Sequence, residues 1–325
     1  MTTNDISPKI WVLADDRAGN VSQCLGVAEA LGRPFAIKTL GYDRFAALPN
    51  LLRGASLLGL DGPSRAGLAP PWPDLVIAAG RRTAPVARWI KRRCGANLVQ
   101  VMDPGSPGRG DFDLIIAPAH DNPRPAANLL EVVAAPHRVT EARLAAEAAI
   151  WRPRLAHLPR PWVAVIVGGA TRKRPFPVEM ARDLGQRVAA LAAGSGGSVL
   201  LTTSRRTGAE QERELARILP EPRWLHLVGQ GGDNPYFGFL ALADAIVVTG
   251  DSVSMCCEAV AAPAPVFIWA PEGWVAAKHA RLHHRLFALG AARPLIGAAS
   301  LAAWDRARPD AAALVAQAIR DRGLG

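Results

Sequence analysis

Short, uninterrupted apolar runs alternate with helix-forming stretches along almost the whole 325-residue chain. Runs that are continuously apolar, rather than alternating in polarity, are typical of parallel strands that helices cover on both faces. We therefore predict an α/β fold of two Rossmann-like, doubly wound domains that face a cleft. The predicted strands are Ile10–Ala14, Phe35–Leu40, Leu75–Ala79, Leu98–Val101, Leu114–Ala117, Trp162–Val167, Ser198–Thr202, Trp224–Val228, Ala245–Val248 and Val266–Trp269.

A segment containing proline and tryptophan, Trp151–Pro161, interrupts this alternation and is typical of a linker. It predicts an N-terminal domain of residues 1–155 and a C-terminal domain of residues 156–325. The sequence leaves open whether the last helix, Asp310–Arg322, packs back on the N-terminal domain. In doubly wound sheets, ligands bind at the carboxyl ends of strands, at the point where the strand order reverses.

The net charge of +10 raises the question of a nucleic-acid or membrane partner. The cationic residues are mostly arginine and are not interleaved with aromatic residues, so we predict no nucleic-acid binding. Residues 1–10 lack an apolar signal region, and no apolar run reaches the roughly 20 residues of a membrane-spanning helix. The four cysteines have no CxxC spacing, which favours a reducing cytoplasm. Peripheral contact with the inner membrane stays open.

The segment Thr249–Glu258 follows a predicted strand and opens an alanine-rich helix. Ser252 and Ser254 lie at the start of this helix, where backbone N–H groups lack intrahelical partners and attract anions. Glu258 lies four residues after Ser254 and projects from the same face. A phosphate-binding helix start beside an acceptor for sugar hydroxyls indicates a nucleotide site. The alternative is an ordinary N-cap with Glu258 in solvent.

Two other loops that follow predicted strands in the second half, starting at Gly168 and Thr203, also contain small, hydroxyl and basic residues. Gly168 and Gly169 give a phosphate close access to backbone N–H groups, and hydroxyl and basic side chains follow each strand. No Walker lysine follows any loop, which disfavours a P-loop NTPase. An ordinary turn remains the alternative for the glycine pair. The predicted nucleotide-sugar site consists of Gly168, Gly169, Thr171, Ser204, Arg205, Asn234, Ser252, Ser254 and Glu258.

The loop after the first predicted strand contains two adjacent carboxylates and a glycine. Asp16 is a predicted general base, with Asp15 beside it, and Gly19 allows close approach of a ligand. The alternative is a helix-capping loop whose acidic residues the helix dipole favours. The GxGxxG pattern is absent, which argues against a dinucleotide site.

Other polar residues follow the remaining strands of the first half. His120 is a second predicted catalytic base, because its ordinary pKa lies near neutrality and Asp103 or Asp121 can orient it. A surface histidine beside a turn is the alternative. Arg81 and Arg82 either clamp an anion or are solvated. The predicted acceptor-side residues are Asp15, Gly19, Asn20, Arg81, Arg82 and Asp103. His279 and His283 lie one helical turn apart without a third ligand, so we predict no metal site.

Six segments carry a collinear resemblance to a known family: Trp11–Arg17, Gly80–Thr83, Gln100–Pro104, Ala117–Asp121, Pro136–Thr140 and Thr249–Glu258. In them the chain resembles bacterial members of the mitochondrial fission ELM (elongated mitochondria) family. The resemblance implies a GT-B-like fold, with the two Rossmann-like domains of GT-B glycosyltransferases, and an enzyme of nucleoside-diphosphate sugars.

The second half is also similar to the enzyme that adds N-acetylglucosamine to lipid I in peptidoglycan synthesis. Gly168-Gly169 matches its UDP-sugar loop, with Ala170 in place of a serine. Ser252 and Glu258 keep the spacing of its second element, with Val253 in place of a glycine. This similarity implies that Glu258 binds the ribose hydroxyls.

Together these features predict a metal-independent glycosyltransferase that uses a nucleotide-diphosphate sugar donor and no cofactor. The acceptor is not identified by the sequence, and lipid-linked or envelope glycans are the options. One alternative is an epimerase acting on nucleotide sugars. The other is a non-catalytic scaffold or membrane-division protein with a degenerate nucleotide site.

Overall fold

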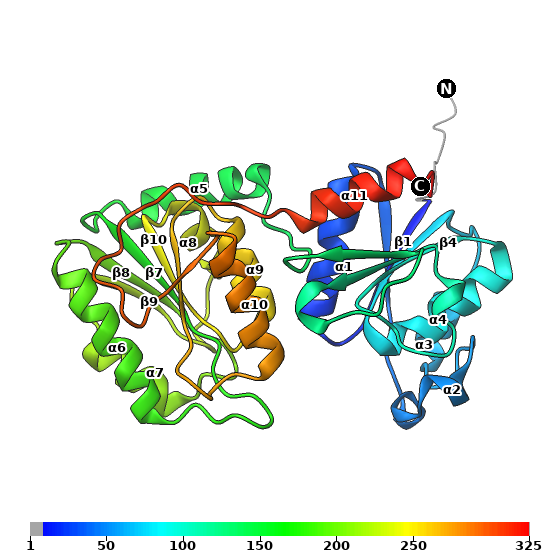
Figure 1. Cartoon of the computed structure of the whole chain (residues 1–325), viewed down its shortest axis with the longest axis horizontal. Helices are drawn as coiled ribbons and strands as arrows, with labels where there is room; N and C mark the ends of the chain where they lie inside the picture. Colours follow the sequence, from blue (N-terminus) through cyan, green and yellow to red (C-terminus); the bar gives the residue numbers. More distant parts are fainter. Residues whose placement is uncertain (1–8, 325) are drawn as a thin grey trace. The chain divides into compact units, whose positions relative to one another are not determined.

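The computed structural model describes residues 9–324, which form two compact units (Figure 1). Unit 1 contains the chain up to Arg138 and again from Asp310 onward, and unit 2 contains Val139–Pro309. Each unit has its own six-stranded parallel sheet with flanking helices, as the alternating apolar runs predict.

The sheet of unit 1 has the strand order β2-β1-β3-β4-β5-β6, and every neighbouring pair is parallel. Residues of β1, β3 and β5 are buried throughout, which explains why these strands are continuously apolar. The strands are β1 (Ile10–Ala14), β2 (Phe35–Thr39), β3 (Leu75–Ala79), β4 (Asn97–Val101), β5 (Leu114–Pro118) and β6 (Leu129–Val132). The α-helices are α1 (Ala18–Leu31), α2 (Asn50–Arg53), α3 (Gly62–Ala66), α4 (Gly80–Cys94) and α11 (Ala311–Asp321).

The last helix, α11, belongs to unit 1 and packs along α1 (Figure 1). Its residues Val315, Ala316 and Ile319 are fully buried and share a hydrophobic core with β1, β3 and α1. This packing resolves the question that the sequence leaves open for the C-terminal helix.

The sheet of unit 2 has the order β12-β11-β10-β7-β8-β9 and is also parallel. Its strands are β7 (Trp162–Ile166), β8 (Ser198–Thr202), β9 (Arg223–His226), β10 (Ala245–Thr249), β11 (Val266–Trp269) and β12 (Arg293–Pro294). Its α-helices are α5 (Glu141–Leu155), α6 (Val178–Ala193), α7 (Ala209–Ile218), α8 (Tyr236–Leu242), α9 (Val253–Ala261) and α10 (Ala277–Ala288).

The predicted domain boundary after residue 155 differs from the observed division because of α5. This helix packs on α8, within unit 2. Trp151 is 3% exposed, and its ring centroid lies 6.3 Å from that of Phe239 in α8. Trp151 therefore anchors a helix where the sequence indicates a linker, and the division between the units falls between Arg138 and Val139.

The strand order reverses once in each sheet. In unit 1 the chain runs from β1 outward to β2 and then continues from β3 on the other side of β1. In unit 2 it runs from β7 outward through β8 and β9, then continues from β10 on the other side of β7. Connections leave in opposite directions at these points, so the carboxyl ends of β1 and β3, and of β7 and β10, are the expected ligand-binding edges.

No helix among residues 9–324 is both long enough and apolar enough to cross a membrane.

Candidate functional site

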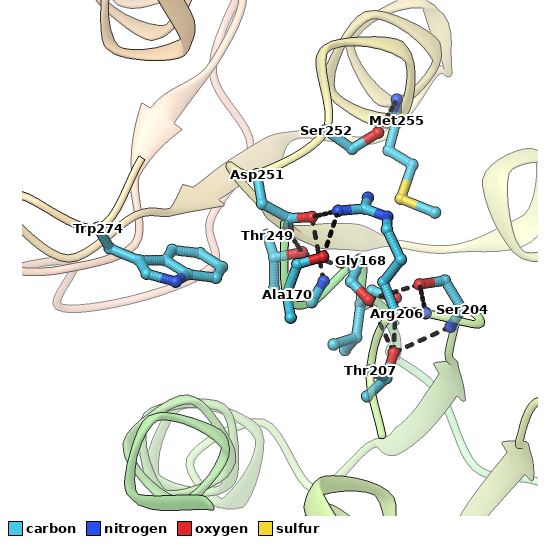
Figure 2. Close-up of polar contacts among 12 residues, drawn as sticks. Gly168, Ala170, Ser204, Arg206, Thr207, Thr249, Asp251, Ser252, Met255 and Trp274 are labelled. Atoms are coloured by element: carbon cyan, nitrogen blue, oxygen red, sulfur yellow. Dashed lines mark hydrogen bonds and ion pairs between the residues drawn. The ribbon is translucent and has the colours of Figure 1, made fainter. Parts of the chain in front are cut away.

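A network of hydrogen bonds joins the ends of β7 and β10 in unit 2 (Figure 2). The N–H of Gly168 donates to Thr249 Oγ1 over 2.8 Å, and the N–H of Gly169 donates to Asp251 Oδ2 over 3.0 Å. Thr249 Oγ1 in turn donates to Asp251 Oδ1 over 2.7 Å. The two strand-end loops that the sequence singles out are therefore held together at the point where the strand order reverses.

Arg206, in the loop after β8, forms an ion pair with Asp251, with Nη1 2.6 Å from Oδ2 (Figure 2). The same loop is tied to the β7 loop by Thr207 Oγ1, which donates to the carbonyl of Gly168 over 2.8 Å. Ser204 Oγ donates to that carbonyl as well. Gly169 has a φ of +123°, and a Cβ atom there would lie 2.2 Å from the carbonyl oxygen of Arg206. Only glycine fits this position.

This network changes the roles available to the predicted diphosphate residues. The N–H groups of Gly168 and Gly169 already donate to Thr249 and Asp251, so they are not directed at a ligand. Arg205 is exposed, whereas its neighbour Arg206 faces the network. The sequence-based site omits Asp251 and Arg206. Asp251 could have been identified from the sequence, because it is a carboxylate that closely follows the buried strand β10.

Helix α9 starts at the same sheet edge. Ser252 is its N-cap, and its Oγ accepts from the N–H of Met255 over 3.4 Å. Ser254 lies in the first helical turn. This start of the helix carries no acidic side chain in its first turn, which leaves the N-terminal end of the helix dipole available to an anion.

Glu258 is 8% exposed and accepts a hydrogen bond of 2.5 Å from the hydroxyl of Tyr236 at the start of α8. Burial and the neighbouring Glu258 carboxylate raise the pKa of Tyr236, so its hydroxyl keeps its proton and remains the donor. Asn234 Oδ1 accepts from the N–H of Tyr236 over 3.0 Å and so fixes the start of α8. Asn234 is thereby linked to Glu258 through Tyr236.

A cavity of about 390 Å³, the unit 2 cavity, lies beside Asp251. Thr171 lines it from a tight turn in which its N–H donates to the carbonyl of Arg174 over 2.8 Å. Trp274 forms an apolar wall. Basic side chains dominate the polar part of the lining: Arg172, Lys173, Arg174, Lys278 and His279. An anionic ligand fits this charge distribution.

In unit 1, the loop after β1 is fixed by Asp15. Its Oδ1 accepts from the N–H of Arg17 over 3.0 Å, and its Oδ2 accepts from Asn20 Nδ2 over 3.1 Å. Asp15 is 8% exposed. These contacts make Asp15 a loop-positioning residue that orients Asn20. Gly19 lies in the first turn of α1, half-buried.

The two predicted catalytic bases have different surroundings. Asp16 is exposed and pairs with Arg82, with Oδ1 2.6 Å from Nη1. The hydrogen bond from Arg82 lowers the pKa of Asp16, which makes this carboxylate a weaker base. His120 is 2% exposed, with Nε2 3.9 Å from Asp121 Oδ1. Burial of the ring restricts its access to a substrate.

A larger cavity of about 670 Å³, the unit 1 cavity, lies at the carboxyl ends of β1, β3, β4 and β5. Of the predicted residues, Asn20, Arg81 and Asp103 line it, whereas Asp15, Asp16, Arg82 and His120 are not among its described lining. Sequence reasoning gave Asp121 only the role of orienting His120, and it did not select several other lining residues: Arg17, Gly80, Met102, Gly105, Ser106, Arg109, Ala117, Asn122, Pro123 and Arg124. Most of them lie in the loops that follow predicted strands, but Arg109 and Arg124 lie further along these loops, where the sequence carries no such signal.

The chain matches the family described as Mitochondrial fission ELM1 over residues 18–323. It belongs to this family. The Uncharacterized protein RP120 of Rickettsia prowazekii (strain Madrid E) is 27% identical over 304 residues, covering 83% of this chain and 85% of that protein. The Mitochondrial fission protein ELM1 of Arabidopsis thaliana is 31% identical over 220 residues, covering 60% of this chain and only 51% of that protein.

Two solved structures show the same fold. UDP-GlcNAc 2-epimerase from Methanocaldococcus jannaschii has a TM-score of 0.53 at 11% identity, covering 97% of this chain and 99% of that chain. The calicheamicin glycosyltransferase CalG4 has a TM-score of 0.51 at 15% identity, covering 98% of this chain and 93% of that chain. The predicted α/β, GT-B-like fold class is thereby confirmed, with two parallel six-stranded sheets and flanking helices.

Proposed function

We propose that this family member is a metal-independent glycosyltransferase whose unit 2 binds a nucleotide-diphosphate sugar. The observation that supports this most directly is the convergence of the β7 and β10 loops with the start of α9 at the reversal point of the sheet. The two similar solved structures carry names of a UDP-sugar epimerase and a glycosyltransferase, which fits a nucleotide-sugar ligand.

In this proposal the diphosphate lies at the start of α9, near Ser252 and Ser254, and beside the basic unit 2 cavity. Gly168, Gly169 and Ser204 shape the loops behind it through Asp251, and Thr171 borders the cavity. The helix dipole and cationic side chains stabilise the charge that develops on the leaving diphosphate. That is the part a metal ion plays in other transferases. Arg205 is the exposed cation of the same loop.

Glu258 is proposed to accept hydrogen bonds from the ribose hydroxyls, with Tyr236 holding the carboxylate in place and Asn234 holding Tyr236. The acceptor is proposed to bind in unit 1, where Asn20, Arg81 and Asp103 line a cavity. Asp16 or His120 is proposed as the base that deprotonates the acceptor hydroxyl. Asp121 lines that cavity and is a third option.

Calorimetric titration of the full chain with UDP tests the donor site. Glu258→Ala should weaken binding roughly tenfold or more, as loss of a hydrogen bond to a charged group predicts. Glu258→Gln retains the side-chain shape, and Glu179→Ala removes an exposed carboxylate of unit 2 as a matched control. Equal UDP affinity in the wild type and both Glu258 variants would rule out this role for Glu258.

A thermal-shift panel with UDP, GDP and UDP-N-acetylglucosamine separates the rival functions, because a bound ligand raises the melting temperature. No shift with any nucleotide favours the non-catalytic scaffold. Conversion of UDP-N-acetylglucosamine without an added acceptor favours the epimerase. A shift without such conversion supports the transferase.

A further inference from the structure

The unit 1 cavity has a strongly cationic lining. Four arginines line it, against two aspartates: Arg17, Arg81, Arg109 and Arg124 against Asp103 and Asp121. Its volume of about 670 Å³ is in the range of small-molecule sites. We infer that this cavity binds a phosphate or diphosphate group of a small ligand, and that this ligand is the acceptor. The second part rests on the proposed function.

Two of the four arginines are held in place by the protein. Arg109 pairs with Asp103, with Nε 3.2 Å from Oδ2, and its Nη2 donates to the carbonyl of Arg124 over 2.6 Å. Arg81 Nη1 donates to the carbonyl of Leu48 over 2.8 Å. These contacts orient the two guanidinium groups before any ligand binds. Both terminal nitrogens of Arg81 donate to backbone carbonyls, of Leu48 and Ala46, so Arg81 and Arg109 contribute fixed positive charge to the lining rather than a free guanidinium fork.

The other two arginines, Arg17 and Arg124, are exposed. Within residues 9–324, neither guanidinium donates a hydrogen bond or forms an ion pair. The Arg17 charge interacts with that of Asp16 and contributes to lowering the pKa of this carboxyl, but it forms no ion pair, so the donors of both arginines are available to a ligand. A phosphate oxygen is the acceptor that matches the guanidinium fork.

Two long helices also begin at this cavity. Arg17 is the N-cap of α1, and Gly80 and Arg81 are the first residues of α4. The described residues provide no side-chain cap to either helix. Backbone N–H groups at both helix starts therefore add to the anion-attracting character of the lining.

The backbone of the cavity is also unusual. Among residues 9–324, the non-glycine residues with a positive φ are Met102 at +67° and Asn122 at +50°, and both line this cavity. The left-handed conformation is unfavourable for methionine, and such strain concentrates at binding sites. Asn20, Asn122 and Ser106 add neutral polar groups that suit a hydroxylated ligand.

Calorimetric titration of the full chain with inorganic pyrophosphate tests the inference. Arg17→Ala/Arg124→Ala should weaken pyrophosphate binding at least tenfold, because each substitution removes charge-assisted hydrogen bonds. Both side chains are exposed, so folding should not change. Arg33→Ala/Arg92→Ala removes two exposed arginines of unit 1 outside the cavity and should leave the affinity within about twofold of the wild type. Equal affinity in the two double variants would overturn the inference.

A second variant keeps this result separate from the donor site of unit 2. Ser252→Asp preserves an N-cap side chain at α9 and places a negative charge where the donor diphosphate is proposed to lie. It should abolish UDP binding while leaving pyrophosphate binding sensitive to Arg17 and Arg124. If UDP does not bind the wild type, the donor proposal fails and the pyrophosphate result still stands. If pyrophosphate binding depends on Ser252 alone, the unit 1 assignment fails.

The phosphate group has two sources, a soluble ester or a lipid headgroup. Cosedimentation with phosphatidylcholine vesicles, with and without phosphatidic acid, distinguishes them. Phosphatidic acid-dependent binding that falls in Arg17→Ala/Arg124→Ala, but not in Arg33→Ala/Arg92→Ala, supports a lipid-borne phosphate. Pyrophosphate binding without vesicle binding supports a soluble ester. If pyrophosphate binding and vesicle binding are lost equally in Arg17→Ala/Arg124→Ala and in Arg33→Ala/Arg92→Ala, the phosphate site does not lie in the unit 1 cavity.

Discussion

Arg206 and Asp251 form an ion pair in which the aspartate is almost fully buried and the arginine is partly solvated. The side chain of Asp251 is 3% exposed and that of Arg206 is 38% exposed. The Asp251 carboxylate also accepts from the Gly169 N–H and the Thr249 hydroxyl, so it joins the loops after β7, β8 and β10. One carboxylate thus determines the shape of the proposed donor site.

Asp251→Asn should destabilise unit 2 by about 2 kcal/mol, because it weakens several charge-assisted hydrogen bonds at a buried position. Thermal unfolding should show a fall in melting temperature of about 4 to 8 °C for this unit. Asp16→Asn is the matched control, since it breaks the exposed pair with Arg82. Exposed ion pairs contribute about 0 to 1 kcal/mol to the free energy of unfolding. If Asp16→Asn lowers the melting temperature as much as Asp251→Asn does, the buried contacts of Asp251 are not what stabilises unit 2.

Gly169→Ala should destabilise unit 2 by about 3 kcal/mol, because the new Cβ meets the Arg206 carbonyl and alanine is strained at a φ of +123°. Gly232→Ala separates these two effects. Gly232 has a φ of +97° with no atom within 4 Å of a built Cβ, so only the backbone strain of about 1 kcal/mol applies. Chemical denaturation should rank the variants in this order. Equal losses would show that the contact with Arg206 is unimportant.

Tyr236→Phe should weaken UDP binding about fivefold, because loss of one hydrogen bond releases the Glu258 carboxylate from its position. The effect should be smaller than that of Glu258→Ala. Tyr42→Phe removes the same hydroxyl group from unit 1 and should leave UDP affinity unchanged. Calorimetry provides the measurement, and a larger loss for Tyr236→Phe than for Glu258→Ala would argue against an indirect role.

Glu214 gives a pH-dependent prediction for the contact between α6 and α7. Hydrogen bonds from Arg217 and Arg182 lower the pKa of Glu214 from 4.5 to about 2. A carboxyl group with a depressed folded-state pKa stabilises the protein above its unfolded pKa, and this contribution is lost as the pH falls through the folded pKa. The stability difference between wild type and Glu214→Gln should therefore be constant from pH 7 to about 5 and shrink from there toward pH 2.

Urea unfolding midpoints measured across this range provide the test. Glu210→Gln is the control, because Glu210 lies exposed in the first turn of the same helix. If the stability difference between wild type and Glu214→Gln grows as the pH falls, the pKa of Glu214 is not lowered in the folded protein.

Ile319→Ala should destabilise unit 1 by about 2 to 5 kcal/mol, because Ile319 of α11 is fully buried in the core shared with α1 and β1. Leu314 of the same helix is 49% exposed, so Leu314→Ala should lower the free energy of unfolding of unit 1 by well under 1 kcal/mol. Hydrogen exchange should accelerate in peptides of β1 and α1 and stay unchanged in β7 and β10. Acceleration confined to unit 2 would contradict the assignment of α11.

The strands buried on both faces are the easiest to predict from the sequence, and among the edge strands of the described residues β2 and β9 were predicted whereas β6 and β12 were not. Leu75–Ala79 and Ala245–Thr249 are buried along their length, and their apolar runs identify them at once. The edge strand β6 carries the exposed Glu131, and the edge strand β12 has two exposed residues, so neither shows such a run. Edge strands bury less surface, so their composition carries less information.

The candidate sites were predictable in their location but not in their contacts. Strand-end loops mark the correct sheet edges because parallel strands bring their carboxyl ends together. Which of Arg205 and Arg206 faces inward depends on the path of the loop, which is set by contacts with Gly168 and Ala170. The positive φ of Met102 likewise follows from tertiary contacts, such as the bond from its N–H to the Ile116 carbonyl.

The return of α11 to unit 1 has a consequence for biosynthesis. The ribosome makes all of Val139–Pro309 after most of unit 1 and before Ala311–Asp321. At typical rates of 5 to 20 residues per second, roughly 15 to 55 s separate the emergence of α1 from that of its covering helix. During this interval the apolar surface of α1 lacks its native cover while unit 2 completes its own core. The domain that leaves the ribosome first is therefore the one that is finished last.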